Sequence, residues 1–302
     1  MRKNPLNLSS KAQYSSATRG GFMSHRTLQT IIPSHPSSDG DGVKIRRIAL
    51  FDKPVADPFL MLDELGSDNP DDYIGGFPPH PHRGMETLTY LRFGTLEHRD
   101  HLGNRGEIRS GGAQWMSAGK GIIHSEMPSR EMSRLHGFQL WINLPAKHKM
   151  DAPKYRDVPA DEITECTLNT GINAKAIAGN WQLNGQKLQG PLQDLAAQAR
   201  YLDLYLPAGS EVTIPIDTGH NALAYVYEGQ LETSPAAPEK SLLVFNQTGD
   251  TLLLQAKSDT QLLLLTGKAI EEPIAHYGPF VMNTREEIEQ AIQDYNNGLF
   301  GN

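Results

Sequence analysis

The stretch FPPHPHRGMETLTY, residues 77–90, places two histidines two positions apart, His80 and His82, just before an alternating apolar run. Successive side chains of an extended strand point to opposite faces, so both imidazoles would lie on one face. Two imidazoles on one face are either a coincidence or half of the ligands of a metal site. The stretch therefore predicts a β-strand that carries part of a metal centre, whose other ligands must come from elsewhere in the chain.

Runs rich in β-branched and aromatic residues recur along the chain, separated by Gly, Pro, Asn and Asp. Clear examples are KIRRIAL (44–50), LHGFQLWINL (135–144), RYLDLYLP (200–207) and ALAYVYEG (222–229). Short strands with turn signals at short intervals are typical of antiparallel sandwiches and barrels. The sequence thus predicts an all-β protein.

Composition limits the class of protein and its partners. The chain has 302 residues, 38% hydrophobic and 21% charged, with a formal net charge of −7. This length allows two domains with a core each. No apolar run approaches the ~18 residues of a membrane span, and the acidic balance argues against direct contact with nucleic acid. The single cysteine, Cys166, cannot form an internal disulfide, which favours a reducing compartment and a cytoplasmic location.

A loop rich in Pro, Asp and Lys, PAKHKMDAPKYRDVP (145–159), divides the chain. We predict an N-terminal barrel in residues 23–150 and a C-terminal barrel in residues 151–302, with a monomer as the default state. Residues 1–22 contain basic residues, no acidic ones and no apolar segment typical of a secretory signal. We interpret them as a disordered tail or an extension ahead of a start at Met23, with an organelle-transit segment as the alternative.

The two halves resemble diverged copies of one unit. A shift of 135 residues places Tyr90 on Tyr225, and it puts Pro215 and Asp217 where the first half has its two histidines. If the second half is a copy, it has lost the histidine pair.

The C-terminal stretch NTREEIEQAIQDYNNG (283–298) predicts a helix of about three turns. Thr284 and Glu287 have the spacing of a capping box, and Ile288 and Ala291 begin an apolar stripe at helical spacing. We expect this helix to dock on the body of the protein.

The other half of the metal site is predicted in GGAQWMSAGKGIIHSEMP, residues 111–128. His124 and Glu126 are again two residues apart, directly after a glycine-containing turn. Together with His80 and His82 they offer three imidazoles and one carboxylate, a set that can hold a divalent first-row metal. Four ligands leave one or two coordination positions open if the metal prefers five or six, and catalysis requires an open position.

Other side chains near these pairs were weighed as ligands. His98 and His101 lie in LEHRDHLGN (96–104), and we interpret them as solvated residues of a polar turn. Glu86 follows His82 by four residues and is a further candidate carboxylate. On a strand, Arg83 would face away from the metal, so we assign it to a salt bridge or to the surface.

The order of these groups resembles the two motifs of cupins, small β-barrels that hold a metal inside. More closely, the chain resembles the pirin family. The matching stretches are DPFLMLDELG (57–66), PHPHRGMETLTYL (79–91), HRDHLGNRGEIRSGGAQWMSAGKGIIHSEMP (98–128), LHGFQLWINLP (135–145) and YGPFVMNTREEI (277–288).

The resemblance implies a bicupin, two double-stranded β-helix barrels with metal in the N-terminal barrel and none in the C-terminal one. The family's ligands fall on His80, His82, His124 and Glu126 of this sequence. Fe(II) is the usual metal of the family, and the same ligand types also bind Cu, Ni and Mn.

The resemblance also implies an oxidoreductase similar to quercetin 2,3-dioxygenases, which open a flavonol with O2 and release carbon monoxide. Glu126 is then the predicted catalytic base. We expect Phe77, Trp115, Met127 and Trp141 to line a pocket for a planar aromatic substrate. The alternative for each of these four side chains is a place in the barrel core.

A second function class fits the same resemblance. Some family members are iron-dependent transcription co-regulators, which contact a protein partner according to the redox state of the metal and need no turnover. A cupin isomerase or a vestigial metal protein is a third option.

Overall fold

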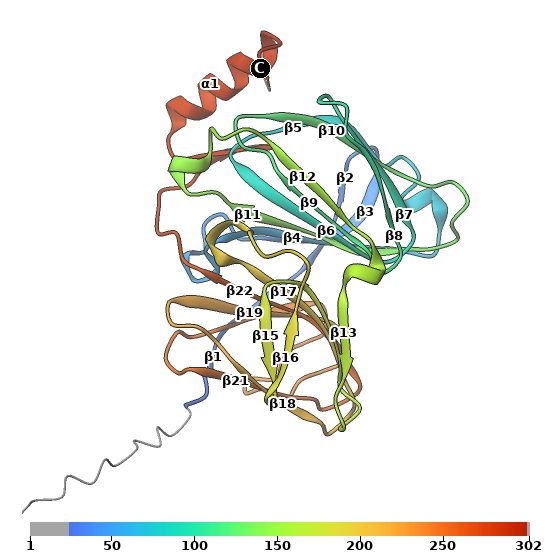
Figure 1. Cartoon of the computed structure of the whole chain (residues 1–302), viewed down its shortest axis with the longest axis vertical. Coiled ribbons are helices and arrows are strands. Elements are labelled where there is room, and N and C mark those ends of the chain that lie inside the picture. The colour runs from blue at the N-terminus through green and yellow to red at the C-terminus, as the bar shows by residue number, and fades with distance from the viewer. Residues whose placement is uncertain (1–23, 301–302) are drawn as a thin grey trace, which may run out of the picture.

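Alternating apolar and polar side chains give the first half of the chain two antiparallel sheets, which form a barrel (Figure 1). The structure is a computed structural model that describes residues 24–300. In spatial order, the larger sheet contains β12 (Lys154–Val158), β9 (Ala113–Ser117), β6 (Met85–Phe93), β11 (Leu135–Asn143), β4 (Phe59–Ser67), β3 (Val43–Ala49) and β2 (His35–Asp39). The smaller sheet contains β5 (Phe77–His82), β10 (Ile122–Pro128), β7 (Thr95–Asp100) and β8 (Arg105–Arg109).

A second barrel lies below the first in Figure 1 and repeats its architecture. Its large sheet contains β1 (Leu28–Pro33), β20 (Ser241–Phe245), β19 (His220–Glu228), β22 (Thr260–Lys268), β17 (Arg200–Leu206), β14 (Asn173–Ala178) and β13 (Thr164–Thr167). Two hairpin-like pairs complete it: β18 (Glu211–Pro215) with β21 (Thr251–Gln255), and β15 (Asn180–Leu183) with β16 (Gln186–Gln189). Apolar side chains such as Val212, Ile214 and Leu252 fill its interior.

The repeat inferred from the sequence corresponds to equivalent strands. Tyr90 lies on β6 and Tyr225 on β19, and each of these strands is third from one edge of its large sheet. Pro215 and Asp217 lie exposed at the end of β18, so the second barrel has no imidazole at either position.

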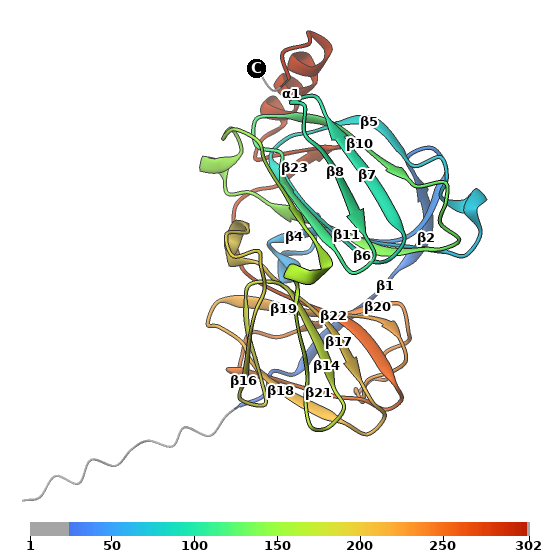
Figure 2. The same cartoon turned by 45° about the vertical axis from the view of Figure 1, so that its right-hand side comes forward.

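Two edge strands lie across the predicted boundary at residues 150 and 151. β1 pairs with β20 of the second barrel, and β12 pairs with β9 of the first, so each large sheet takes an edge strand from beyond the predicted boundary (Figure 1, Figure 2). β12 lies inside the loop that we read as the linker, where Tyr155 and Asp157 alternate with exposed residues. The predicted extension, residues 1–22, lies outside the described residues.

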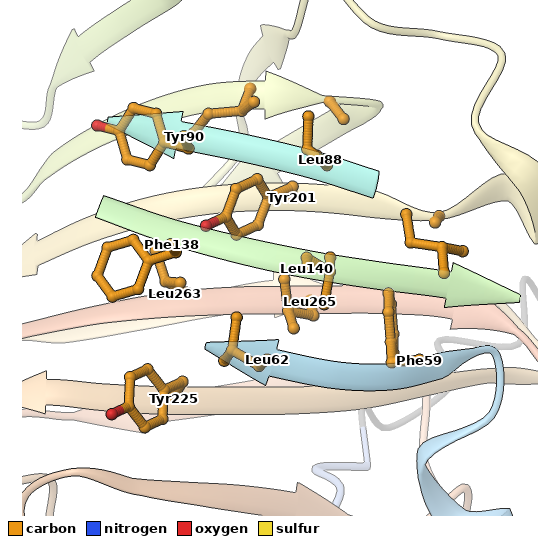
Figure 3. Close-up of a cluster of buried hydrophobic side chains, with 14 of the residues drawn as sticks. Phe59, Leu62, Leu88, Tyr90, Phe138, Leu140, Tyr201, Tyr225, Leu263 and Leu265 are labelled. Carbon is orange, nitrogen blue, oxygen red and sulfur yellow. The ribbon is translucent and has the colours of Figure 1, made fainter. Parts of the chain in front are cut away.

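The two large sheets pack face to face through one apolar cluster (Figure 3). Leu88, Phe138 and Leu140 from the first barrel meet Leu263 and Leu265 from the second. Burying this much apolar surface stabilises both barrels together.

Three buried tyrosines in the same interface donate hydrogen bonds to two carboxylates. The hydroxyl of Tyr225 donates to Glu64 Oε2 at 2.7 Å, and those of Tyr90 and Tyr227 donate to the two oxygens of Asp203 at 2.9 and 2.6 Å. The bonds of Tyr225 and Tyr90 join the two barrels, and that of Tyr227 holds Asp203 in place within the second barrel. These polar contacts fix how the two barrels sit against one another.

Replacing Phe138 with alanine is expected to lower the free energy of unfolding by about 3–5 kcal/mol, because the ring is fully buried between the sheets. Urea unfolding measures the change. Leu102→Ala, at a site that is 48% exposed, is the control and should stay within about 0.5 kcal/mol of wild type. A loss below about 1 kcal/mol for F138A would show that the interface does not couple the barrels as described.

The C-terminal segment forms β23 (Ala275–Tyr277), β24 (Phe280–Met282) and α1 (Arg285–Asn296), and the predicted helix is confirmed. The capping box is present in both directions: the Glu287 amide donates to Thr284 Oγ1 at 3.2 Å, and the Thr284 amide donates to Glu287 Oε2 at 3.0 Å. None of the helices in residues 24–300 is long and apolar enough to span a membrane. The short 3-10 helices are η1 (Pro54–Ala56), η2 (Pro70–Asp72), η3 (Ala146–His148), η4 (Ala160–Glu162) and η5 (Ala196–Gln198).

The helix docks on the first barrel, although we assigned it to the second (Figure 1). Arg83 donates from Nη1 to Asp294 Oδ2 of α1 at 2.8 Å, so the predicted salt bridge of Arg83 is confirmed. Lys149 is almost fully buried, and its ammonium donates to the carbonyls of Gly84 and Val281 at 2.7 and 3.1 Å. These contacts hold the C-terminal segment next to the strand that carries His82.

Candidate metal centre

The small sheet of the first barrel brings the two predicted ligand pairs together. β10 lies between β5 and β7, and its register sets His124 opposite His80 and Glu126 opposite Phe77. His124 and Glu126 are buried while the residues between and beside them are more exposed, so both side chains face the barrel interior.

The three histidines form one compact cluster. Each of His80, His82 and His124 offers a ring nitrogen that lies within 4.8 Å of the others, and Nε2 of His80 lies 3.0 Å from Nε2 of His82. Nδ1 of His80 lies 2.9 Å from the carbonyl oxygen of Pro78, an acceptor that holds the ring proton on Nδ1 and leaves the lone pair on Nε2.

The donor atoms fit a cation better than they fit one another. Nε2 of His124 is buried and has no hydrogen-bond partner among residues 24–300, which is unusual for a buried polar atom. Two imidazole nitrogens at 3.0 Å both carry a free lone pair if each ring keeps its proton on Nδ1. Converging lone pairs inside a barrel are what a mononuclear metal site requires.

Burial keeps two of these imidazoles neutral. Desolvation lowers the pKa of His82 and of His124 well below the usual 6.5, and the neighbouring imidazoles lower both further. A neutral imidazole is the form that binds a metal, so protons do not compete for these sites near neutral pH.

Glu126 lies on the same face but is held by neutral donors. Its Oε2 accepts a hydrogen bond from Nε2 of Gln139 at 2.9 Å, and its Oε1 accepts one from the hydroxyl of Thr89 at 3.2 Å. Its carboxylate is not among the ligand atoms that lie within 4.8 Å of one another. The structure therefore groups three of the four predicted ligands, and ligation by Glu126 stays a prediction.

Thr89 and Gln139 belong to a polar row that crosses the floor of the barrel. Cross-strand pairing runs from Arg47 to Asp63, Gln139, Thr89 and Gln114 on five adjacent strands. Side chains of directly paired residues lie on the same face of a sheet. If one member of the row faces the barrel interior, all five members do. The row gives Glu126 a fixed hydrogen-bonding surface.

Glu86 is not positioned to bind the metal. On β6 the side chains of Glu86, Leu88 and Tyr90 share the face that packs on the second barrel, opposite to that of Thr89. Glu86 accepts a hydrogen bond from the amide of Ala196 at 2.9 Å and borders an inter-barrel cavity of about 600 Å³. Burial raises the pKa of this carboxyl to about 7.

Glu86→Gln is expected to stabilise the protein at about pH 8 by up to ~3 kcal/mol, because a pKa raised from 4.5 to about 7 disfavours the charged folded state. In the wild-type protein, the raised pKa of Glu86 contributes to folding stability in full below pH 4.5, and this contribution is lost as the pH rises through about 7. The gain should therefore vanish near pH 4.5. Urea unfolding across this range measures it, with the exposed Glu107→Gln as control. A pH-independent difference would contradict the assignment.

His98 is a second correction. We read it as solvated, but it lies on β7 with 0% exposure, and its Nδ1 lies 3.4 Å from Nδ1 of His124. His101 is exposed in the following turn, as expected. The signal that could have identified His98 is the two-residue spacing between His98 and Asp100, which matches the spacing within both ligand pairs.

A cavity of about 560 Å³ borders the histidine cluster. Phe77 and Trp141 line it as predicted, and the Trp141 ring meets the His82 ring edge-on at a centroid distance of 5.1 Å. Trp115 and Met127 do not line it. Trp115 pairs with Leu88 and therefore faces the inter-barrel cluster, and Met127 lies on the outer face of β10 with 38% exposure.

Other lining residues come from segments that sequence spacing did not connect with the histidines. Gln139 lies on the barrel floor, and Phe51 stacks on His276 with ring centroids 4.0 Å apart. His276 belongs to the C-terminal segment, which closes one side of the cavity together with Gly278 and Pro279. The sequence gives no periodic signal for this contact, because it joins parts of the chain more than 200 residues apart.

Comparison with known proteins agrees with this architecture. The sequence profile described as Pirin matches residues 43–142, and that of the pirin C-terminal cupin domain matches residues 201–301. A Vibrio cholerae protein named "Putative quercetin 2,3-dioxygenase" is 49% identical over 275 residues, covering 91% of this chain and 98% of its own length. Mouse pirin is 35% identical over 286 residues, covering 92% of this chain and 95% of its own length.

A solved structure gives the same result at the level of the fold. The quercetin 2,3-dioxygenase from Acinetobacter baumannii superposes with a TM-score of 0.84 at 32% identity, covering 92% of this chain and 99% of that one. The expected all-β bicupin architecture with its terminal helix is thus confirmed. The chain belongs to the pirin family, and its two barrels are cupin domains.

Proposed function

We propose that this protein is a mononuclear metal-dependent dioxygenase that opens flavonol-like substrates with O2, with Fe(II) as the metal. The observation that carries the proposal is the cluster of three imidazoles, two of them buried and neutral, beside a cavity with aromatic walls. The Vibrio cholerae relative, whose name carries this activity, supports the choice of reaction.

In this proposal His80, His82 and His124 hold the metal, with Glu126 as the fourth ligand. A divalent transition metal bound there would supply Lewis-acid stabilisation of a substrate oxyanion. The site has no thiolate among these donors, and imidazole with carboxylate suits Fe, Mn, Ni and Cu alike.

The cavity determines how a planar substrate would lie. Its volume of about 560 Å³ is within the range of ~300–1,000 Å³ typical of small-molecule sites. Phe77 and Trp141 offer aromatic surface to flat rings.

In this proposal Glu126 takes the proton of the substrate hydroxyl when its carboxylate loosens from the metal. Its carboxylate is 2% exposed, and Thr89 and Gln139 both donate hydrogen bonds to it. These two neutral donors orient the carboxylate oxygens.

The test is anaerobic reconstitution with Fe(II), followed by quercetin and O2. We expect loss of the flavonol absorbance together with release of carbon monoxide. No turnover with Fe(II), Mn(II), Ni(II) or Cu(II), in protein that binds one metal per chain, would contradict the enzymatic proposal. That result would favour the redox-sensing protein-binding module instead.

A further inference from the structure

Three adjacent strands of the small sheet each carry two polar side chains two residues apart. They are His80 and His82 on β5, His124 and Glu126 on β10, and His98 and Asp100 on β7. The register sets Asp100 opposite His124 and His98 opposite Glu126. The third pair is used by no part of the proposed function, yet both of its side chains are 0% exposed.

His98 lies between a metal-site histidine and a carboxylate. Its Nδ1 is 3.4 Å from Nδ1 of His124, and its Nε2 is 3.5 Å from Oδ2 of Asp100. If both imidazoles are neutral and the two Nδ1 atoms form a hydrogen bond, one Nδ1 carries the shared proton and the other accepts it. The distances thus allow two arrangements, and they differ in what His124 can do.

Nε2 of His98 makes no hydrogen bond within residues 24–300, and the charged oxygen that faces it is Oδ2 of Asp100 at 3.5 Å. The attraction of this negative charge for the ring proton favours one of the two arrangements. With its proton on Nε2, facing Asp100, His98 accepts at Nδ1 the hydrogen bond that His124 donates from its own Nδ1. His124 then keeps a free lone pair on its Nε2. This nitrogen is buried and has no hydrogen-bond partner among the described residues. In the opposite arrangement the proton of His124 sits on Nε2, and that atom cannot bind a metal.

Both members of the pair are held in place. Oδ1 of Asp100 accepts the amides of Leu102 and Asn104 at 3.0 and 2.9 Å, and Oδ2 accepts Nδ2 of Asn104 at 2.7 Å. The His98 ring lies against the Tyr155 ring with centroids 4.6 Å apart. The orientation that Asp100 imposes on His98 is therefore fixed by the surrounding turn and ring.

We propose that His98 and Asp100 are positioning residues that fix the tautomer and ring orientation of His124 for metal binding. This inference rests on the metal centre of the proposed function, but not on the identity of the substrate. Carboxylates and backbone carbonyls orient metal-binding histidines in this way in many proteins, and here a second histidine relays the effect.

The test uses Co(II) as the probe and measures affinity by competition with a chromophoric chelator, together with the visible spectrum of the bound ion. Asp100→Asn is the sharpest variant, because the amide keeps its size but turns an N–H toward His98 and so favours the wrong tautomer. We expect a loss of about 10–100-fold in Co(II) affinity for D100N and for His98→Leu. His98→Gln, which can both accept and donate, should recover most of this loss.

A buried histidine away from the metal serves as the matched control. His136 contacts Glu64 Oε1 at 3.0 Å between the barrels, so H136Q should leave Co(II) affinity and spectrum unchanged. Wild-type affinity in both D100N and H98L would overturn the proposal. Equal losses of Co(II) affinity in H98L and H98Q, together with the spectral change expected for a missing nitrogen ligand, would overturn the proposal. They would show that His98 binds the metal directly. Absence of Co(II) binding by the wild-type protein would refute the metal centre itself.

Discussion

His124→Ala is expected to lower metal affinity by more than ~100-fold, because it removes a ligand rather than a residue that orients one. His124 is central to the cluster: its ring centroid lies 4.4 Å from that of His80 and 5.0 Å from that of His82. Two remaining imidazoles and a carboxylate cannot restore the lost nitrogen, because the nearest other imidazole, His98, lies behind His124 on the neighbouring strand. Competition with a chromophoric chelator measures the affinity.

The control for this variant is His148→Ala. His148 is half-exposed on η3, where its Nδ1 lies 2.8 Å from an oxygen of Asp151, and it should bind metal as the wild type does. Circular dichroism verifies that H124A is folded before affinities are compared. Unchanged affinity in folded H124A would place the metal elsewhere in the chain.

Glu126→Gln is expected to lower the rate of flavonol turnover by about 10²–10⁴-fold while metal remains bound. The amide has the shape of the carboxylate and can still accept the hydrogen bond from Gln139, but it cannot take a proton from the substrate hydroxyl. Because the three histidines are untouched, most of the metal affinity should survive. Steady-state turnover and metal content, measured on the same sample, separate the two effects.

Glu97→Gln is the matched control for this second variant. Glu97 lies on β7 of the same sheet, where it pairs with the exposed Arg99 and Arg105, so its loss should leave turnover unchanged. Full activity in E126Q would remove Glu126 as the base. Complete loss of metal in E126Q would show instead that its main role is ligation.

Local periodicity accounts for what the sequence predicted correctly. The two-residue spacing of His80 and His82, and of His124 and Glu126, reports a shared face once each stretch is a strand. The capping box at Thr284 is equally local, so the helix could be predicted with its start. Features that depend on residues within one strand or turn were therefore accessible.

Features that depend on which strands become neighbours were not accessible. Glu86 occurs on a strand that was predicted, whereas no strand was predicted at Trp115. Which face of β6 and of β9 meets the second barrel is decided only by how the sheets stack. His98 looked solvated because its neighbours along the chain are charged: Arg99 is exposed and Glu97 is half-buried. Its own side chain alternates inward, where β10 covers it.

The exchanged edge strands have the same explanation. β1 and β12 are edge strands, which pair on one side only, so loop composition does not show which sheet each of them joins. The choice is made by long-range packing, as when Ile31 of β1 contacts the core of the second barrel. A boundary placed by loop composition alone cannot detect such a crossing.

The most direct test of the metal centre is anomalous diffraction from crystals grown with Fe(II) under anaerobic conditions. The geometry predicts one anomalous peak per chain, within bonding distance of a ring nitrogen of His80, His82 and His124 alike. A peak bound elsewhere, or well-ordered histidines with no peak between them at full metal loading in solution, would contradict the account.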